Sequence, residues 1–177
     1  MVFSGYQENG LITRIANVDY AVGACRDVVI AVWRKRTHLD GVAMLKEYIE
    51  ERAKLHKRLS LLQIIEDDAA PPDALPRKAL ARMHGEHAAL IRKSAVVYAK
   101  PGFSGATARA IITGVALINP PKFEHEIFAS LTSALQWLYS DPKAADSQDL
   151  LPQAVEQLRA RDIFIPSNDR AREIGRK

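Results

Sequence analysis

Residues 59–65 read LSLLQII and residues 66–72 read EDDAAPP. The first segment is a nearly continuous apolar run, which is typical of a strand buried on both faces in a sheet covered by helices. Acidic residues and prolines then stop the strand. In open α/β sheets the sites lie in the crevice beyond the carboxyl ends of the strands. We therefore expect a functional site next to Glu66, Asp67 and Asp68.

The segments before this strand predict two strands and a helix. Residues 17–25 alternate polar and apolar, as a strand with one wet face does, and residues 28–33 form a short β-branched run. The connection between them is tight, so the pair is antiparallel. A helix is expected from Thr37 to about His56, and Thr37 with Asp40 forms a capping-box-like start.

The segments after this strand continue the alternation of helices and strands. They predict a helix from Asp73 or Pro76 to Lys93, a strand over 94–100, a helix opened by Ser104, an edge strand over 123–128 and a helix opened by Ser130 or Thr132. This order predicts an α/β fold with a mixed, mainly parallel sheet flanked by helices.

We expect one folded domain with two appendages. Residues 1–16 are interpreted as an N-terminal arm or an irregular first strand, residues 17–141 as the α/β domain, and residues 142–177 as a C-terminal extension. The extension contains a short amphipathic helix around Leu151 and Leu158, followed by a basic tail. That helix must bury its apolar stripe on the domain or on another chain.

The composition excludes several classes of protein. The 177 residues are 47% hydrophobic and 26% charged, as in an ordinary globular protein, and the net charge of +4 comes without a basic stripe interleaved with aromatics. We therefore expect no nucleic-acid partner. No run approaches a membrane span, the first residues lack the pattern of a secretory signal, and Cys25 is the single cysteine, so we expect a cytoplasmic protein without disulfides.

Residues from about 18 to 139 resemble the STAS-like domains, which share the fold of the anti-sigma-factor antagonist SpoIIAA. The resemblance rests on the strand pair ending at residues 28–33, on the helix opened by Thr37 and Asp40, and on the closing sequence IFASLTSALQWL at residues 127–138. It implies a module that binds a protein partner. In this family the binding is often switched by phosphorylation of a serine or threonine where the third strand meets the second helix.

The matching place in this chain is residues 66–70, which contain no hydroxyl residue. Its three acidic residues suggest a permanently negative surface that resembles the phosphorylated state. The alternative interpretation is structural: Asp67, Asp68 and Asp73 cap the amino end of the following helix, where negative charge is favourable.

A second candidate lies where the strand over 94–100 meets the next helix. Ser104 is interpreted first as an N-cap. Backbone amides at this helix start also suit an anion, so Ser104 and Thr107 are a candidate anion-binding or phosphorylation site. A nucleophilic role for Ser104 needs a base, and the sequence nominates none.

The remaining chemically interesting residues favour structural roles. His84 and His87 are three residues apart, which lets two imidazoles share a metal ion, but the spacing is not that of the His-Glu-x-x-His motif. We assign no metal and no cofactor. Cys25 is expected to be a small core residue. Trp33 and Trp137 are expected to pack in the core.

The sequence thus predicts a non-catalytic regulatory or scaffolding module of a bacterial signalling system that binds a protein, a second copy of itself, or both. The predicted partner-binding residues are Glu66, Asp67, Asp68, Phe103, Ser104, Leu151, Leu158 and Phe164. Two alternatives stay open: a small hydrolase or transferase using Ser104, and a domain that binds a lipid or a small acidic ligand.

Overall fold

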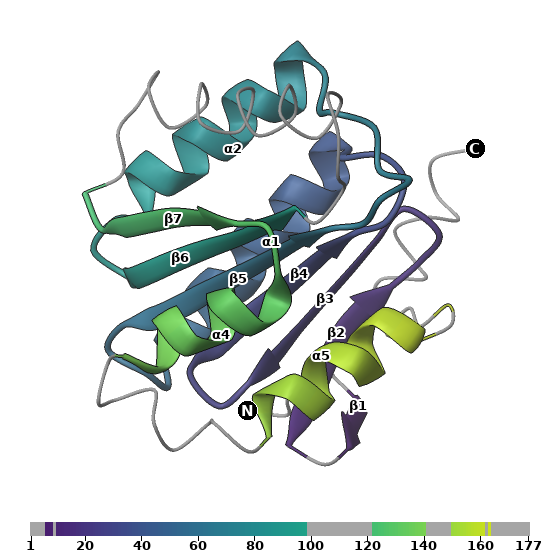
Figure 1. The fold of residues 1–177 in the computed structure, drawn as a ribbon. Coiled ribbons are helices and arrows are strands. Elements are labelled where there is room, and N and C mark those ends of the chain that lie inside the picture. Colours follow the sequence, from purple (N-terminus) through teal and green to yellow (C-terminus); the bar gives the residue numbers. More distant parts are fainter. Residues whose placement is uncertain (1–5, 9, 99–121, 141–149, 162, 164–177) are drawn as a thin grey trace.

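A computed structural model describes residues 6–8, 10–98, 122–140, 150–161 and 163 (Figure 1). These residues contain a seven-stranded sheet whose strands follow one another in chain order. The strands are β1 (Tyr6–Glu8), β2 (Leu11–Ala16), β3 (Tyr20–Cys25), β4 (Val28–Trp33), β5 (Leu59–Ile65), β6 (Ile91–Tyr98) and β7 (Glu124–Phe128). The described helices are α1 (Leu39–Ala53), α2 (Ala74–Glu86), α4 (Leu131–Tyr139) and α5 (Leu151–Ala160).

The sheet changes from antiparallel to parallel at its centre. Strands β1 to β4 pair antiparallel through short turns, and β4 to β7 pair parallel. Each parallel pairing needs a crossover that passes over a face of the sheet. The predicted α/β fold with a mixed sheet is confirmed, and the parallel half is the half that contains β5.

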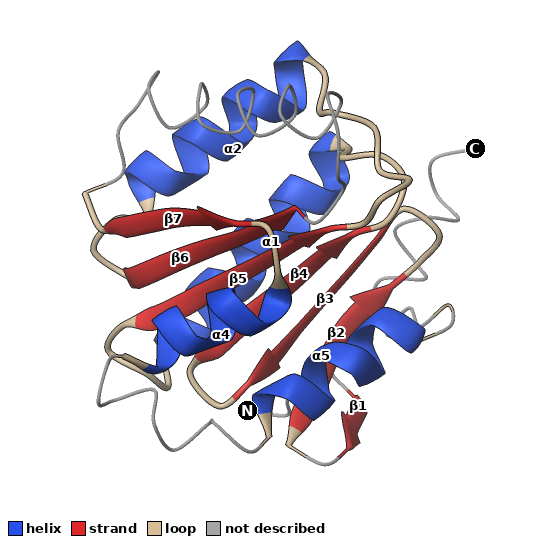
Figure 2. Cartoon of the chain, viewed as in Figure 1, coloured by secondary structure: helices blue, strands red, loops and turns tan. Residues whose placement is uncertain are grey.

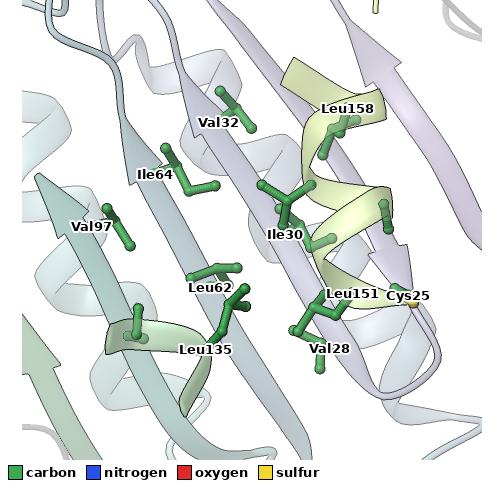
Figure 3. Close-up of a cluster of buried hydrophobic side chains, with 14 of the residues drawn as sticks. Cys25, Val28, Ile30, Val32, Leu62, Ile64, Val97, Leu135, Leu151 and Leu158 are labelled. Carbon is green, nitrogen blue, oxygen red and sulfur yellow. The ribbon is translucent and has the colours of Figure 1, made fainter. Parts of the chain in front are cut away.

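Helices cover both faces of the sheet (Figure 2). Helices α1 and α2 pack on one face, where Leu45, Ile49 and Met83 join side chains of β3, β4 and β5. Helices α4 and α5 pack on the other face, where Leu135 and Leu158 join a second cluster (Figure 3). The sheet is therefore the middle layer of three.

Strands β4 and β5 have the bounds that their apolar runs predict, because they lie in the middle of the sheet and both of their faces are buried. The prediction of a wet face for β3 is wrong. All six residues of β3 are buried, since α1 covers one face and α5 covers the other.

The N-terminal segment is part of the sheet. Strand β2 pairs with β3 along its whole length, and Leu11 and Ile15 are buried. Their period-two spacing is interrupted by a register shift between Thr13 and Ile15. Of the two interpretations of this segment, an arm or an irregular first strand, residues 11–16 agree with the second, and they form the first long strand of the domain.

Two predicted helix boundaries are also wrong. Helix α1 begins at Leu39, and its N-cap residue His38 makes no side-chain capping bond, so Thr37 does not open it. Helix α2 ends at Glu86 and not at Lys93, because a turn closed by a hydrogen bond from Leu90 N to His87 O leads directly into β6.

The last two described helices behave as their patterns predict. Ser130 caps α4 by accepting a hydrogen bond from Ser133 N (3.2 Å). Helix α5 buries its stripe on this chain's own sheet, which is one of the two options that its amphipathic pattern left open. The helix predicted from Ser104 lies outside the described residues.

Within the described part of the chain, no helix is long and apolar enough to cross a membrane.

Candidate functional site

The loops that follow β2, β4 and β5 meet at one end of the sheet. Strand β3 begins at Tyr20, which pairs with Trp33 at the end of β4, and Trp33 in turn pairs with Ile65 at the end of β5. Residues 17–19, 34–38 and 66–70 therefore leave the sheet at the same end, on the right in Figure 1. We call these three loops together the carboxyl-end surface.

Backbone hydrogen bonds join the three loops. Arg34 N donates to Asp19 O (2.7 Å), and Ala70 N donates to Lys35 O (2.7 Å). The first loop is itself fixed by Asn17, whose side-chain oxygen accepts from Asp19 N (2.9 Å) and Tyr20 N (2.8 Å). This side-chain-to-backbone turn is a characteristic use of asparagine in tight turns. The loops thus form one preorganised surface.

Arg34 attaches the C-terminal helix to this surface. Its guanidinium donates to three carbonyls at the end of α5, those of Leu158 (3.0 Å), Arg159 (3.2 Å) and Arg161 (2.7 Å). The last carbonyls of a helix have no partner within the helix and carry partial negative charge. A cation at this position therefore satisfies them and opposes the helix dipole.

Glu66 makes the second attachment of α5. Its carboxylate accepts two hydrogen bonds from Arg159, Nε to Oε1 (2.6 Å) and Nη2 to Oε2 (2.7 Å). These bonds raise the pKa of the Arg159 guanidinium. Glu66 was predicted as a partner-binding residue, and the structure shows that its carboxylate already has a partner within the chain.

Asp67 and Asp68 are both exposed in the turn that follows β5. The prediction that they cap a helix with Asp73 is not supported by the geometry. Helix α2 begins at Ala74, and its N-cap residue Asp73 makes no side-chain capping bond. Asp67 and Asp68 belong to the turn after β5 and precede α2 by several residues, and both are exposed on the carboxyl-end surface.

Apolar side chains are exposed at the same end of the molecule. Val18 in the first loop is 57% exposed, and Leu39 and Leu75 at the starts of α1 and α2 are 48% and 66% exposed. Ile163, two residues beyond the Arg161 carbonyl held by Arg34, is 67% exposed. Of the large apolar side chains exposed in the described ranges, only Leu55 lies at the opposite end. Clustered exposed apolar groups beside charged ones are typical of interaction surfaces.

The other predicted site residues divide into two groups. Leu151 and Leu158 are fully buried in the cluster beneath α5 (Figure 3), so their side chains are not available to a partner and their assignment is corrected. Phe103, Ser104, Thr107 and Phe164 lie outside the described residues.

His84 of α2 and His87, the C-cap residue of this helix, have separate structural partners. His87 faces α1, with Nε2 at 2.7 Å from Glu50 Oε1. His84 faces the sheet, where its Nε2 lies 3.4 Å from Gln63 Nε2, and Gln63 Oε1 accepts from Trp33 Nε1 (3.3 Å). Burial lowers the pKa of His84 to about 4, with His125 nearby as a smaller cause. The described residues contain no metal-binding group of three such side chains.

Cys25 is a core residue, as predicted. Its side chain is fully buried on β3, and burial raises the pKa of its thiol. A thiol that resists ionisation is a poor nucleophile. Trp33 is also buried, whereas Trp137 is partly buried and packs against Phe128 (ring centroids 5.6 Å apart).

The residues that organise this site were not predicted from the sequence. Arg34 and Arg159 bring together segments that are more than 90 positions apart in the chain. Nothing local distinguishes an arginine that caps a distant helix from an arginine that faces water. Asn17 is the exception, because an asparagine before a tight turn is a recognisable signal.

No protein-family model matches this chain, and no curated protein matches it. Among solved structures, the chain is similar to the crystal structure of an uncharacterized protein of the DUF3478 family from Shewanella loihica PV-4, described as having a SpoIIAA-like fold. The identity is 14%, the TM-score is 0.46, and the match covers 76% of this chain and 99% of the other. The α/β assignment itself rests on the strand order and pairing, and the match says nothing about activity.

Proposed function

We propose that this protein is a non-catalytic regulatory module of a bacterial signalling system, and that it binds a protein partner through the carboxyl-end surface. The observation that carries the proposal is that exposed Val18, Asp67 and Asp68 lie on loops that are already joined to one another, with the exposed apolar side chains of Leu39, Leu75 and Ile163 at the same end of the molecule. A surface ordered before binding loses less conformational entropy when a partner arrives.

The chemistry of the surface supports a protein partner. Val18 and Ile163 offer apolar contact, while Asp67 and Asp68 offer charge that selects a basic patch on the partner. Protein interfaces combine an apolar centre with a polar rim in this way. Arg34 and Glu66 are less exposed and hold α5 in place. We therefore propose that they support the surface and do not contact the partner.

The acids stand where the STAS-like domains, by resemblance, have a phosphorylated hydroxyl residue. We propose that Asp67 and Asp68 give this position a constant negative charge, so that binding is not switched by phosphorylation there. The hydrolase or transferase alternative depends on Ser104, which lies outside the described residues, and no described residue adds support to it.

The proposal is tested by capturing partners from an extract of the source cell with three forms of the full chain. These are the wild type, a variant with Val18→Asp, Asp67→Lys and Asp68→Lys, and a control with Leu55→Asp and Lys57→Glu at the opposite end of the sheet. A partner retained by the wild type and the control, and lost by the first variant, supports the proposal. Equal retention by all three forms contradicts it.

A further inference from the structure

A groove separates the outer sides of α1 and α2. Its volume is about 370 Å³, and its apolar lining comes from Leu39, Val42, Ala43, Ala79 and Met83. Lys46 of α1 and Glu86 of α2 face each other across it (3.5 Å). The groove and the outward residues of the two helices form what we call the α1–α2 face, which is separate from the loops of the carboxyl-end surface.

Apart from Lys46 and Glu86, which pair with each other across the groove, the exposed charged residues of α1 are acidic and those of α2 are basic. On α1 the outward positions include Asp40 and Glu47, which are exposed. On α2 the outward positions include Lys78 and Arg82, which are also exposed, and Arg82 forms an ion pair with Glu86 of its own helix. An exposed pair of this kind contributes little to stability, so it does not hinder a second contact. Ala43 and the apolar lining of the groove lie between the acidic positions of α1 and the basic positions of α2.

This arrangement is complementary to itself. Helices α1 and α2 each connect parallel strands across the same face of the sheet, so they run in the same direction (Figure 1). A two-fold axis parallel to the helices places α1 of one protomer over α2 of its partner, and acid then faces base twice. A two-fold axis perpendicular to the helices places α1 over α1, so that acid faces acid.

The positions of the charged residues along the helix axes agree with the arrangement in which the two-fold axis is parallel to the helices. The Lys46–Glu86 and Glu50–His87 contacts set which turns of α1 and α2 lie side by side. In that register Lys78 is level with the first turn of α1, and Arg82 is level with Ala43. A two-fold axis along the helices keeps these levels, so Lys78 approaches Asp40 across the interface, while Arg82 lies opposite Ala43, about one helical turn from each of Asp40 and Glu47.

We propose that the α1–α2 face is the interface of a homodimer, with α1 of each protomer lying over α2 of the other. The occupant of the groove is a second copy of this chain, because the charge pattern complements itself only in that arrangement. Such an interface is isologous, with each pair of contacts made twice. It covers Leu39, which lines the groove, but it leaves the three loops with Val18, Asp67 and Asp68 outside the interface, so the dimer and the proposed partner binding use different residues.

Sedimentation velocity of the full chain over a range of concentrations tests this proposal. The wild type is expected to form a dimer that dissociates as salt is raised, since charge steers and selects the contact. An acidic variant, Lys78→Glu with Arg82→Glu, has two acidic sides. A basic variant, Asp40→Lys with Glu47→Lys, has two basic sides. Each alone is expected to raise the dissociation constant by about tenfold or more.

The decisive arm is an equimolar mixture of the two variants. In the mixture both contacts pair opposite charges, so we expect a heterodimer whose affinity is close to that of the wild-type dimer. Formation of this heterodimer also shows that both variants are folded. Lys57→Glu is the matched control, because it makes the same charge change as Lys78→Glu on an exposed loop away from the face, and it leaves the dimer unchanged. A monomeric wild type, variants that dimerise as the wild type does, or a mixture that stays monomeric would overturn the proposal.

Discussion

Arg159 holds the carboxylate of Glu66 through two hydrogen bonds of 2.6 and 2.7 Å, and so joins α5 to the end of β5. The two residues are far apart in the chain, and the contact is made on the rim of the surface that we propose for partner binding. Together with the carbonyls held by Arg34, it makes the C-terminal helix part of the domain.

The two attachments of α5 are expected to differ in strength. Arg34→Ala leaves the last carbonyls of α5 without their donor and removes a cation from the helix end, so it is expected to lower the free energy of unfolding by about 2 kcal/mol. Glu66→Ala breaks an ion pair that is partly open to water, with the Arg159 side chain 37% exposed, and is expected to cost about 1 kcal/mol or less. Urea denaturation measures both values.

A comparison of two single variants checks the assignment to Glu66. Arg159 also lies 3.3 Å from Glu156, whose side chain is 65% exposed, and Glu156→Ala is the matched control with an expected loss below about 0.5 kcal/mol. A larger loss for Glu156→Ala than for Glu66→Ala would show that the pair with β5 is not the one that holds the helix.

Helix α5 is expected to be essential to the core. Leu158 is fully buried, so Leu158→Ala is expected to destabilise the chain by about 3 kcal/mol. Ile163, which is 67% exposed, provides a matched comparison, and Ile163→Ala is expected to change the free energy of unfolding by less than about 0.5 kcal/mol. Similar small losses for both substitutions would mean that α5 is not docked on the sheet.

His84 makes stability depend on pH in a defined direction. Burial lowers its pKa from the ordinary 6.5 to about 4, so between these values the unfolded chain binds a proton that the folded chain does not. Its contribution is fully present above pH 6.5 and is lost as the pH falls toward 4, with an upper limit of about 3 kcal/mol.

The variant His84→Gln removes this titration. Its free energy of unfolding is expected to fall less steeply than that of the wild type between pH 6.5 and 4, when both are measured by denaturant titration at several pH values. Parallel slopes for the two proteins would contradict the assignment.

Gly41 is expected to be required in α1. A helical glycine replaced by alanine normally gains about 1 kcal/mol. Here a Cβ at position 41 would lie 3.0 Å from both Trp33 Cζ3 and Tyr20 Cδ1, which are rings held in the core. Gly41→Ala is therefore expected to lower the free energy of unfolding by about 1–2 kcal/mol. A stabilised variant in thermal unfolding would show that the rings move aside.

The sequence predicted the parts of the fold whose patterns are local. Strands β4 and β5 are continuous apolar runs bounded by turns, and their bounds are as predicted. The end of α2 was misplaced because Leu90 and Ile91 continue the helical spacing of Leu80 and Met83, although they belong to a turn and a strand. The solvent-facing side predicted for β3 is covered by α5 in the structure, and the sequence did not show on which surface α5 packs.

The sequence predicted at which end of the sheet the candidate site would lie, but it did not predict the contacts that organise the site. The carboxyl end of β5 and the exposed Asp67 and Asp68 follow from the sequence, since a strand ending in acids places those acids at the sheet end. The role of Arg34 does not follow, because its hydrogen bonds join it to Leu158, Arg159 and Arg161 through the tertiary fold alone. Long-range contacts of this kind leave no periodicity and no motif in the sequence.

The central claim is that a protein partner binds at the carboxyl-end surface, and hydrogen exchange of the full chain with and without its captured partner tests it most directly. Backbone amides in residues 17–19, 34–38 and 66–70 are expected to exchange more slowly in the complex, while those of α4 and β7 stay unchanged. Protection confined to α4 and β7, with no change in the three loops, would contradict the account.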